Sequence, residues 1–71
     1  MTKNALYLTL TNQLSPVWKQ DAILLEEDLA LWNAARRIDD WLVHYQDDDR
    51  VSVEQYARNC ERLLAIYRTT T

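Results

Sequence analysis

Glycine is absent from all 71 residues of the sequence, and proline occurs once, at Pro16. Glycine readily adopts the positive φ angles of tight turns, β-bulges and phosphate-binding loops. Its absence argues against dinucleotide-binding fingerprints, P-loops and the tightest β-hairpins, whose geometry normally requires it. Because no helix breaker follows Pro16, we expect long helices joined by short connections.

Cysteine is almost as scarce, because Cys60 stands alone and has no partner for a disulfide within the chain. No apolar run approaches the ~20 residues that span a membrane, and the first residues lack a signal-peptide pattern. A lone cysteine without a secretion signal is typical of a reducing compartment. We therefore expect a cytoplasmic protein that does not act at a membrane.

Positive charge is also in short supply, with 8 Lys and Arg against 11 Asp and Glu and a formal net charge of −3. Surfaces that bind DNA or RNA are usually basic, so direct nucleic-acid binding is not expected. The length predicts one small helical domain, 1–71, with a core near the minimum for independent stability. With no disulfide and no clustered metal ligands, we expect self-association or a bound partner to add stability, and we predict a homodimer.

Residues 5–11 alternate strictly between apolar and polar side chains, with Leu6, Leu8 and Leu10 on one side. Such alternation is typical of a β-strand. The chain offers no second strand, so a strand here would have to pair with another copy or with a partner. The alternative is an extended or helical arm whose leucines cover a helix, and the pattern does not decide between the two.

A long helix is predicted over about 16–46. Ser15 is a favourable N-cap and Pro16 fits the first helical position, although Asp21 offers a second start. The apolar residues then follow a heptad-like stripe with one row of Val17, Leu24, Leu31, Ile38 and Tyr45. The second row contains Ala34 and Trp41 but is interrupted by Gln20 and Glu27, and Ala35 and Leu42 widen the stripe. With either start, a helix of roughly 25–30 residues would extend for about 40 Å.

A shorter helix is predicted over about 52–68, where Ser52 and Gln55 form a capping-box pair. Its apolar stripe consists of Val53, Tyr56, Ala57, Cys60, Leu63, Leu64 and Tyr67. The short connection makes the two helices antiparallel neighbours, so we predict an all-α helical hairpin with an N-terminal arm. In this hairpin Trp41 packs near Cys60 or Tyr56, and the Cys60 thiol is buried.

A second apolar side of the long helix lies roughly 100° from the heptad stripe. It contains Leu25, Leu29, Trp32 and Val43, with Arg36 one turn after Trp32. Tryptophan and arginine are enriched among the residues that dominate binding energy at interfaces. We expect these residues to bind a protein partner or a second copy, and the alternative is that the N-terminal arm covers Trp32.

Acidic residues form a third pattern, made up of Glu26, Glu27, Asp28, Asp39, Asp40, Asp47, Asp48 and Asp49. The run that starts at Asp47 does not match the spacing of a calcium-binding loop. Val51 stands where the third ligand would be required, and the glycine of such a loop is absent. Carboxylates before a helix instead complement its positive N-terminal dipole. We expect neither a metal nor a cofactor, and an acidic surface that imitates nucleic acid is an alternative function.

Catalysis is not expected. His44 falls on the polar side of the long helix without a second histidine, and Cys60 lies within an apolar stripe. Asp39 and Asp40 are adjacent on a helix, so their carboxylates diverge instead of pairing for acid–base work. No residue is therefore predicted to be catalytic.

The sequence favours a non-enzymatic protein–protein interaction module, such as a small regulator, inhibitor or assembly factor that acts through an apolar helix face. The first alternative is the acidic mimic, for example a phage-type inhibitor of a DNA- or RNA-binding complex. The second is a DNA-binding dimer of the ribbon-helix-helix type, because the order strand, helix, helix matches. This chain departs from the ribbon-helix-helix pattern, because it has no glycine for the tight turn. The polar side of its expected strand also carries no arginine or glutamine to contact DNA.

Overall fold

The computed structural model describes residues 2–14 and 27–69 of the chain. Within these ranges it contains three helices and no strand: α1 (Lys3–Leu14), α3 (Leu29–His44) and α4 (Val53–Thr69). The all-α class expected from the sequence is confirmed. None of these helices is long and apolar enough to cross a membrane.

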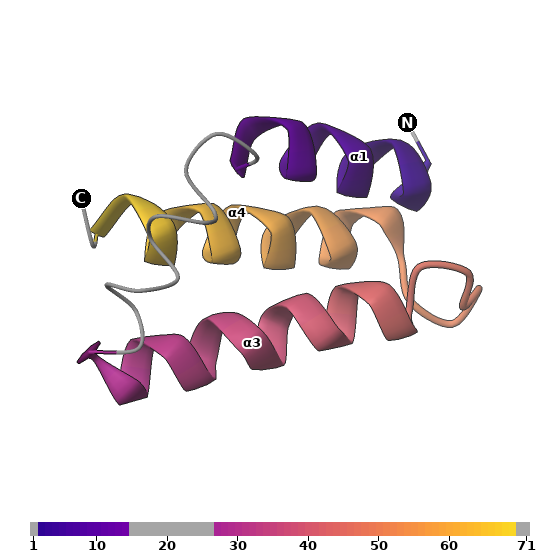
Figure 1. The fold of residues 1–71 in the computed structure, drawn as a ribbon. Helices are drawn as coiled ribbons and strands as arrows, with labels where there is room; N and C mark the ends of the chain where they lie inside the picture. The colour runs from indigo at the N-terminus through magenta and orange to yellow at the C-terminus, as the bar shows by residue number, and fades with distance from the viewer. Residues whose placement is uncertain (1, 15–26, 70–71) are drawn as a thin grey trace.

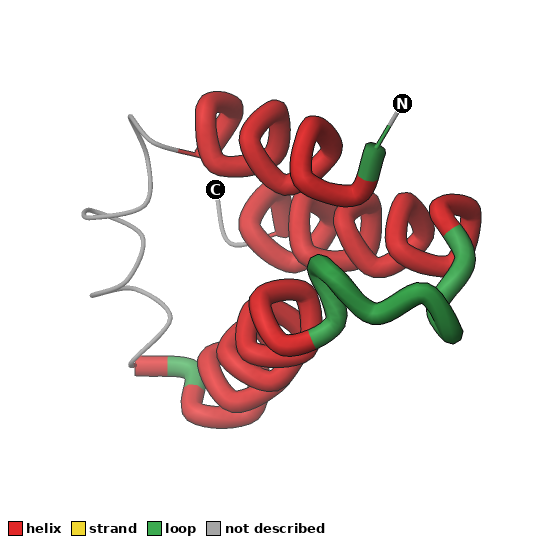
Figure 2. The backbone as a smooth tube through the Cα atoms, turned by 90° about the vertical axis from the view of Figure 1, so that its right-hand side faces the viewer, coloured by secondary structure: helices red, strands yellow, loops and turns green. Residues whose placement is uncertain are grey.

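Helix α4 is the central element, because it packs against α3 on one side and against α1 on the other (Figure 1). Residues 45–52 join α3 to α4, which run in opposite directions. Viewed from the side, α1 and α3 lie on either side of α4 (Figure 2). The described part of the chain is thus a three-helix arrangement, whereas a hairpin with an extended arm was expected.

The prediction of a strand or extended arm over 5–11 is wrong, because these residues lie within α1 and pack against α4, as the alternative of a helical arm expected. Thr2 begins the helix, and its hydroxyl oxygen accepts a hydrogen bond of 3.1 Å from the Ala5 amide. No strand lies within the described residues to pair with this segment, whereas a helix satisfies its backbone groups internally. Leu10 and Leu14 stand four residues apart, on one side of α1, and their residues are 2% and 4% exposed.

The prediction of one continuous helix over 16–46 is also wrong, because α3 begins at Leu29. Asp28 has non-helical backbone angles of φ −104° and ψ 89° and accepts a hydrogen bond of 3.3 Å from the Leu31 amide. Aspartate is among the most favourable N-caps, so α3 starts at this residue and does not continue a helix through it. The predicted start at Pro16 lies outside the described residues.

Helix α4 begins and ends within one residue of its predicted bounds. The Ser52 hydroxyl oxygen accepts a hydrogen bond of 3.1 Å from the Gln55 amide, as expected of an N-cap. Cys60 is 6% exposed, which confirms its predicted burial. The Trp41 ring lies 6.0 Å from the Tyr56 ring, so the prediction that Trp41 packs near Tyr56 is also confirmed.

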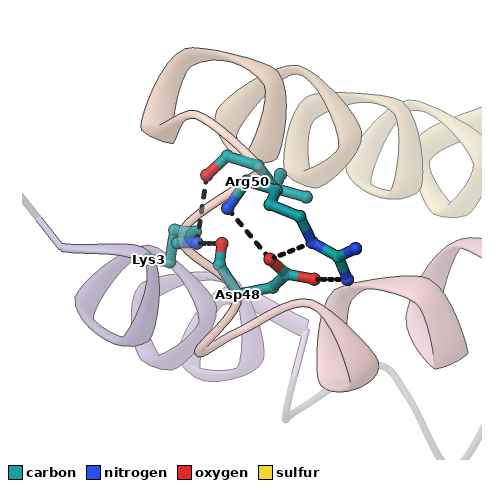
Figure 3. A network of polar contacts seen from close by, with 4 residues as sticks. Lys3, Asp48 and Arg50 are labelled. Carbon is teal, nitrogen blue, oxygen red and sulfur yellow. Dashed lines mark hydrogen bonds and ion pairs between the residues drawn. The ribbon is translucent and has the colours of Figure 1, made fainter.

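The connection between α3 and α4 is held by a small polar network (Figure 3). The Lys3 ammonium, at the start of α1, donates to the carbonyl oxygens of Asp48 and Val51. The Asp48 carboxylate accepts 2.9 Å and 3.1 Å hydrogen bonds from the Arg50 amide and Nε, and a 2.8 Å ion pair joins it to the Arg50 guanidinium. The connection is therefore tied to α1 as well as to itself.

Candidate functional site

One side of α3 presents apolar side chains to solvent. Leu29 is 64% exposed and Val43 is 53% exposed, and Trp32 and Arg36 follow Leu29 at the spacing of one helix side. We call these four residues the outer α3 face. It extends for about 21 Å along the axis, at 1.5 Å per residue. The residues that α3 buries, Ala35 and Leu42, belong to its other side.

Trp32 and Arg36 are paired within the outer α3 face. The Arg36 guanidinium carbon lies 5.0 Å from the centroid of the Trp32 ring, within the range of a cation–π interaction. Arg36 is exposed and Trp32 is partly buried, and a pair of this kind contributes about 0.5–1 kcal/mol at an exposed position. The pairing restricts two large side chains before any partner arrives, which lowers the entropy cost of binding.

The structure brings together four of the five residues predicted to bind a partner. Leu29, Trp32, Arg36 and Val43 share one side of α3, whereas Leu25 lies outside the described residues. Trp32 is not among the partly buried residues that pack against the core, and α1 packs principally against α4. The alternative that residues 5–11 cover Trp32 therefore receives no support from this packing.

The predicted acidic surface is divided between structural and free carboxylates. Asp28 caps α3, Asp39 accepts a hydrogen bond of 3.1 Å from the Tyr7 hydroxyl, and Asp48 pairs with Arg50. The others within the described residues are exposed at the two ends and the middle of α3: Glu27, Asp40, Asp47 and Asp49. Glu26 lies outside the described residues. The acidic residues are thus spread along α3 and its two ends.

Burial is the first cause of the raised pKa values of the titratable groups inside the fold. Burial, assisted by the nearby Asp39 carboxylate, raises the pKa of Tyr7 to about 12. Burial also raises the pKa of Asp39, although the hydrogen bond from Tyr7 opposes this. Burial raises the pKa of the Cys60 thiol, which makes it a poor nucleophile. These groups support packing between helices and do not form a nucleophile–base pair.

A groove between α3 and α4 has no counterpart in the sequence predictions. Its volume is about 330 Å³, and its lining residues come from both helices: Arg37, Ile38, Trp41, Gln55, Asn59 and Arg62. We call it the interhelical groove. The spacing of Gln55, Asn59 and Arg62 beside the buried stripe of α4 is the signal that would have indicated it. The sequence pattern alone did not reveal which α3 residues face them.

No group of three or more His, Cys, Asp or Glu residues lies close enough to hold a metal ion within 2–14 and 27–69. Comparison with protein-family models, with curated proteins and with solved structures gives no match to this chain.

Proposed function

We propose that the protein is a non-enzymatic interaction module that binds a protein partner through the outer α3 face. The observation that carries the proposal is the high exposure of Leu29 and Val43, at 64% and 53%, on the same helix side as the Trp32–Arg36 pair. Exposed apolar side chains gathered around a tryptophan and an arginine are typical of interface centres.

The spacing of the outer α3 face indicates how a partner would engage it. Leu29, Trp32, Arg36 and Val43 stand at positions i, i+3, i+7 and i+14, which is the anchor pattern of a helix lying in an apolar groove. Helix α3 would thus present its outer side while its inner side stays packed on α4. A module of this kind regulates, inhibits or assembles its partner by contact alone.

The buried, high-pKa thiol of Cys60 supports a non-enzymatic role and a reducing, cytoplasmic setting.

A second copy of the chain is the alternative occupant of the outer α3 face. Sedimentation velocity distinguishes the two cases, because a homodimer formed through this face would dissociate when Leu29 and Val43 are both changed to serine. A foreign partner would instead leave the free protein monomeric.

Photo-cross-linking locates the contact directly. A benzoylphenylalanine side chain at position 43 should cross-link to the partner in cells of the native host. The same probe at Asn12, which is exposed on α1, is the matched control and should give no such product. Equal cross-linking from both positions, or cross-linking from position 12 alone, would place the interface elsewhere and remove the proposal.

The acidic nucleic-acid mimic is the competing function, and the structure gives it less support. Asp28, Asp39 and Asp48 are each engaged by hydrogen bonds within the chain. A mimic needs its carboxylates free and arranged along one surface. The ribbon-helix-helix alternative loses its basis, since residues 5–11 are helical.

A further inference from the structure

The interhelical groove has two chemically different ends. Trp41 lies beside Tyr56, near the start of α4, with 6.0 Å between the ring centroids. Because α3 and α4 run in opposite directions, Arg37, one turn before Trp41, and Arg62, further along α4, both lie toward the other end. One end of the groove therefore carries two guanidinium groups, and the other end carries an indole ring.

The two arginines are not paired with any carboxylate of the described residues. Neither Arg37 nor Arg62 forms an ion pair within the parts of the chain that the structure describes. The Arg62 guanidinium makes a long contact of 3.4 Å with the Asn59 side-chain oxygen, and both arginines are exposed. Two like charges at one end of a groove repel each other until an anion is placed between them. In a chain whose net charge is −3, this is a local reversal of sign.

We propose that the interhelical groove binds an extended acidic segment of a partner protein. A carboxylate of the segment lies between Arg37 and Arg62, and an apolar side chain two residues along lies against Trp41. The guanidinium group is a planar fork of donors that matches a carboxylate, which favours this anion for the charged end.

The dimensions of the groove match such a segment. Arg37 and Trp41 are four residues apart on a helix, a separation of about 6 Å along the axis. In an extended peptide, side chains two residues apart lie on the same side and are separated by about 6.6 Å. An acidic residue and an apolar residue with one residue between them therefore fit both ends. A small free anion would neutralise the arginines but leave Trp41 and Ile38 uncovered.

The test uses the full-length protein labelled with ¹⁵N and a short synthetic peptide, acetyl-Ser-Glu-Ser-Leu-Ser-amide. The Trp41 indole N–H signal and the Nε–H signals of Arg37 and Arg62 should shift together and saturate. Replacing the glutamate of the peptide with glutamine should weaken binding about tenfold, the loss expected for a hydrogen bond to a charged group. Placing the leucine directly after the glutamate, on the opposite side of the extended chain, should weaken binding as well.

Matched protein variants assign the effect to the groove. Arg37→Ala and Arg62→Ala should each weaken peptide binding about tenfold while helicity is retained, because alanine favours helices. Arg58→Ala is the control: it removes the same charge from an exposed position one turn before Arg62, and Arg58 does not line the groove. The control should bind the peptide as tightly as the unmodified protein.

Three results would overturn the proposal. Inorganic phosphate that shifts the same signals at the same concentration as the peptide would indicate a small-anion site. Equal losses from Arg58→Ala and Arg62→Ala would indicate non-specific attraction. Signals that shift with protein concentration in the absence of peptide would show a second copy in the groove. None of these results bears on the outer α3 face, which uses other residues of α3.

Discussion

The Tyr56 hydroxyl donates a hydrogen bond of 2.8 Å to the carbonyl oxygen of Leu42, and both residues are fully buried. Leu42 lies in the last turn of α3, where carbonyl groups have no partner within the helix. A side chain of α4 therefore satisfies the end of α3. Burial also raises the pKa of Tyr56, so the phenol keeps the proton that it donates.

Tyr56→Phe should destabilise the protein by about 1–3 kcal/mol, because the buried Leu42 carbonyl would lose its partner while the ring remains. In a chain of this size each kcal/mol lowers the melting temperature by roughly 4–8 °C. Urea unfolding followed by circular dichroism measures the change. Stability equal to that of the unmodified protein would show that this bond does not hold α3 and α4 together.

Cys60→Ser should cost about 1–3 kcal/mol, because the new hydroxyl would be buried within an apolar contact. The native thiol should react slowly with a bulky maleimide at mildly alkaline pH, since it is buried and its pKa is raised. In denaturant the same thiol should react at the rate of a free cysteine. Fast labelling of the folded protein would contradict the packing of α1 and α4 around Cys60.

Asp39 should make stability decrease as the pH rises above the acid range. Its pKa is raised in the folded state, so the folded protein holds this proton to a higher pH than the unfolded chain does. That contribution is complete below the unfolded pKa of about 3.9 and is lost as the pH rises through the folded pKa. Asp39→Asn retains an oxygen that accepts from Tyr7 and should remove this decrease. An unchanged pH profile would contradict the assignment.

Asp48 should change the pH dependence of stability in the opposite direction to Asp39, so that its contribution is lost as the pH falls. Hydrogen bonds from Arg50 lower the pKa of Asp48 to about 2. Its contribution is present above an unfolded pKa of about 3.9 and is lost as the pH falls toward the folded value. Asp48→Asn should therefore flatten the acid limb of the stability curve, and Arg50→Gln should do the same. Asp47→Asn is the matched control, since Asp47 is exposed and takes no part in this network.

Helix α4 is the element whose bounds the sequence predicted to within one residue. Ser52 and the Tyr56–Cys60–Leu63 stripe predicted α4 because both signals depend on neighbours within one turn. The error over 5–11 arose because Leu6, Leu8 and Leu10 fit a period of two, while Leu6, Leu10 and Leu14 also fit a helix. Packing on α4, which the sequence does not encode locally, decided between them.

The candidate sites also differ in whether they depend on one helix or on the packing between two helices. The outer α3 face was predictable, because Leu29, Trp32, Arg36 and Val43 belong to one helix and their shared side follows from spacing. The interhelical groove was not, since the presence of Arg37 and Arg62 in one groove depends on the register between two helices. Asp28 was assigned to an acidic surface because its role as an N-cap depends on the backbone angles at that residue.

The affinity of the identified partner for the Trp32→Ala variant tests the central claim most directly. Isothermal titration calorimetry should show a loss of ~2 kcal/mol or more, about thirtyfold, with helicity largely unchanged. Neutralising Asp47 and Asp49 together should alter only the association rate and its dependence on salt. The acidic mimic predicts the reverse, and unchanged affinity for the Trp32→Ala variant would contradict binding through the outer α3 face.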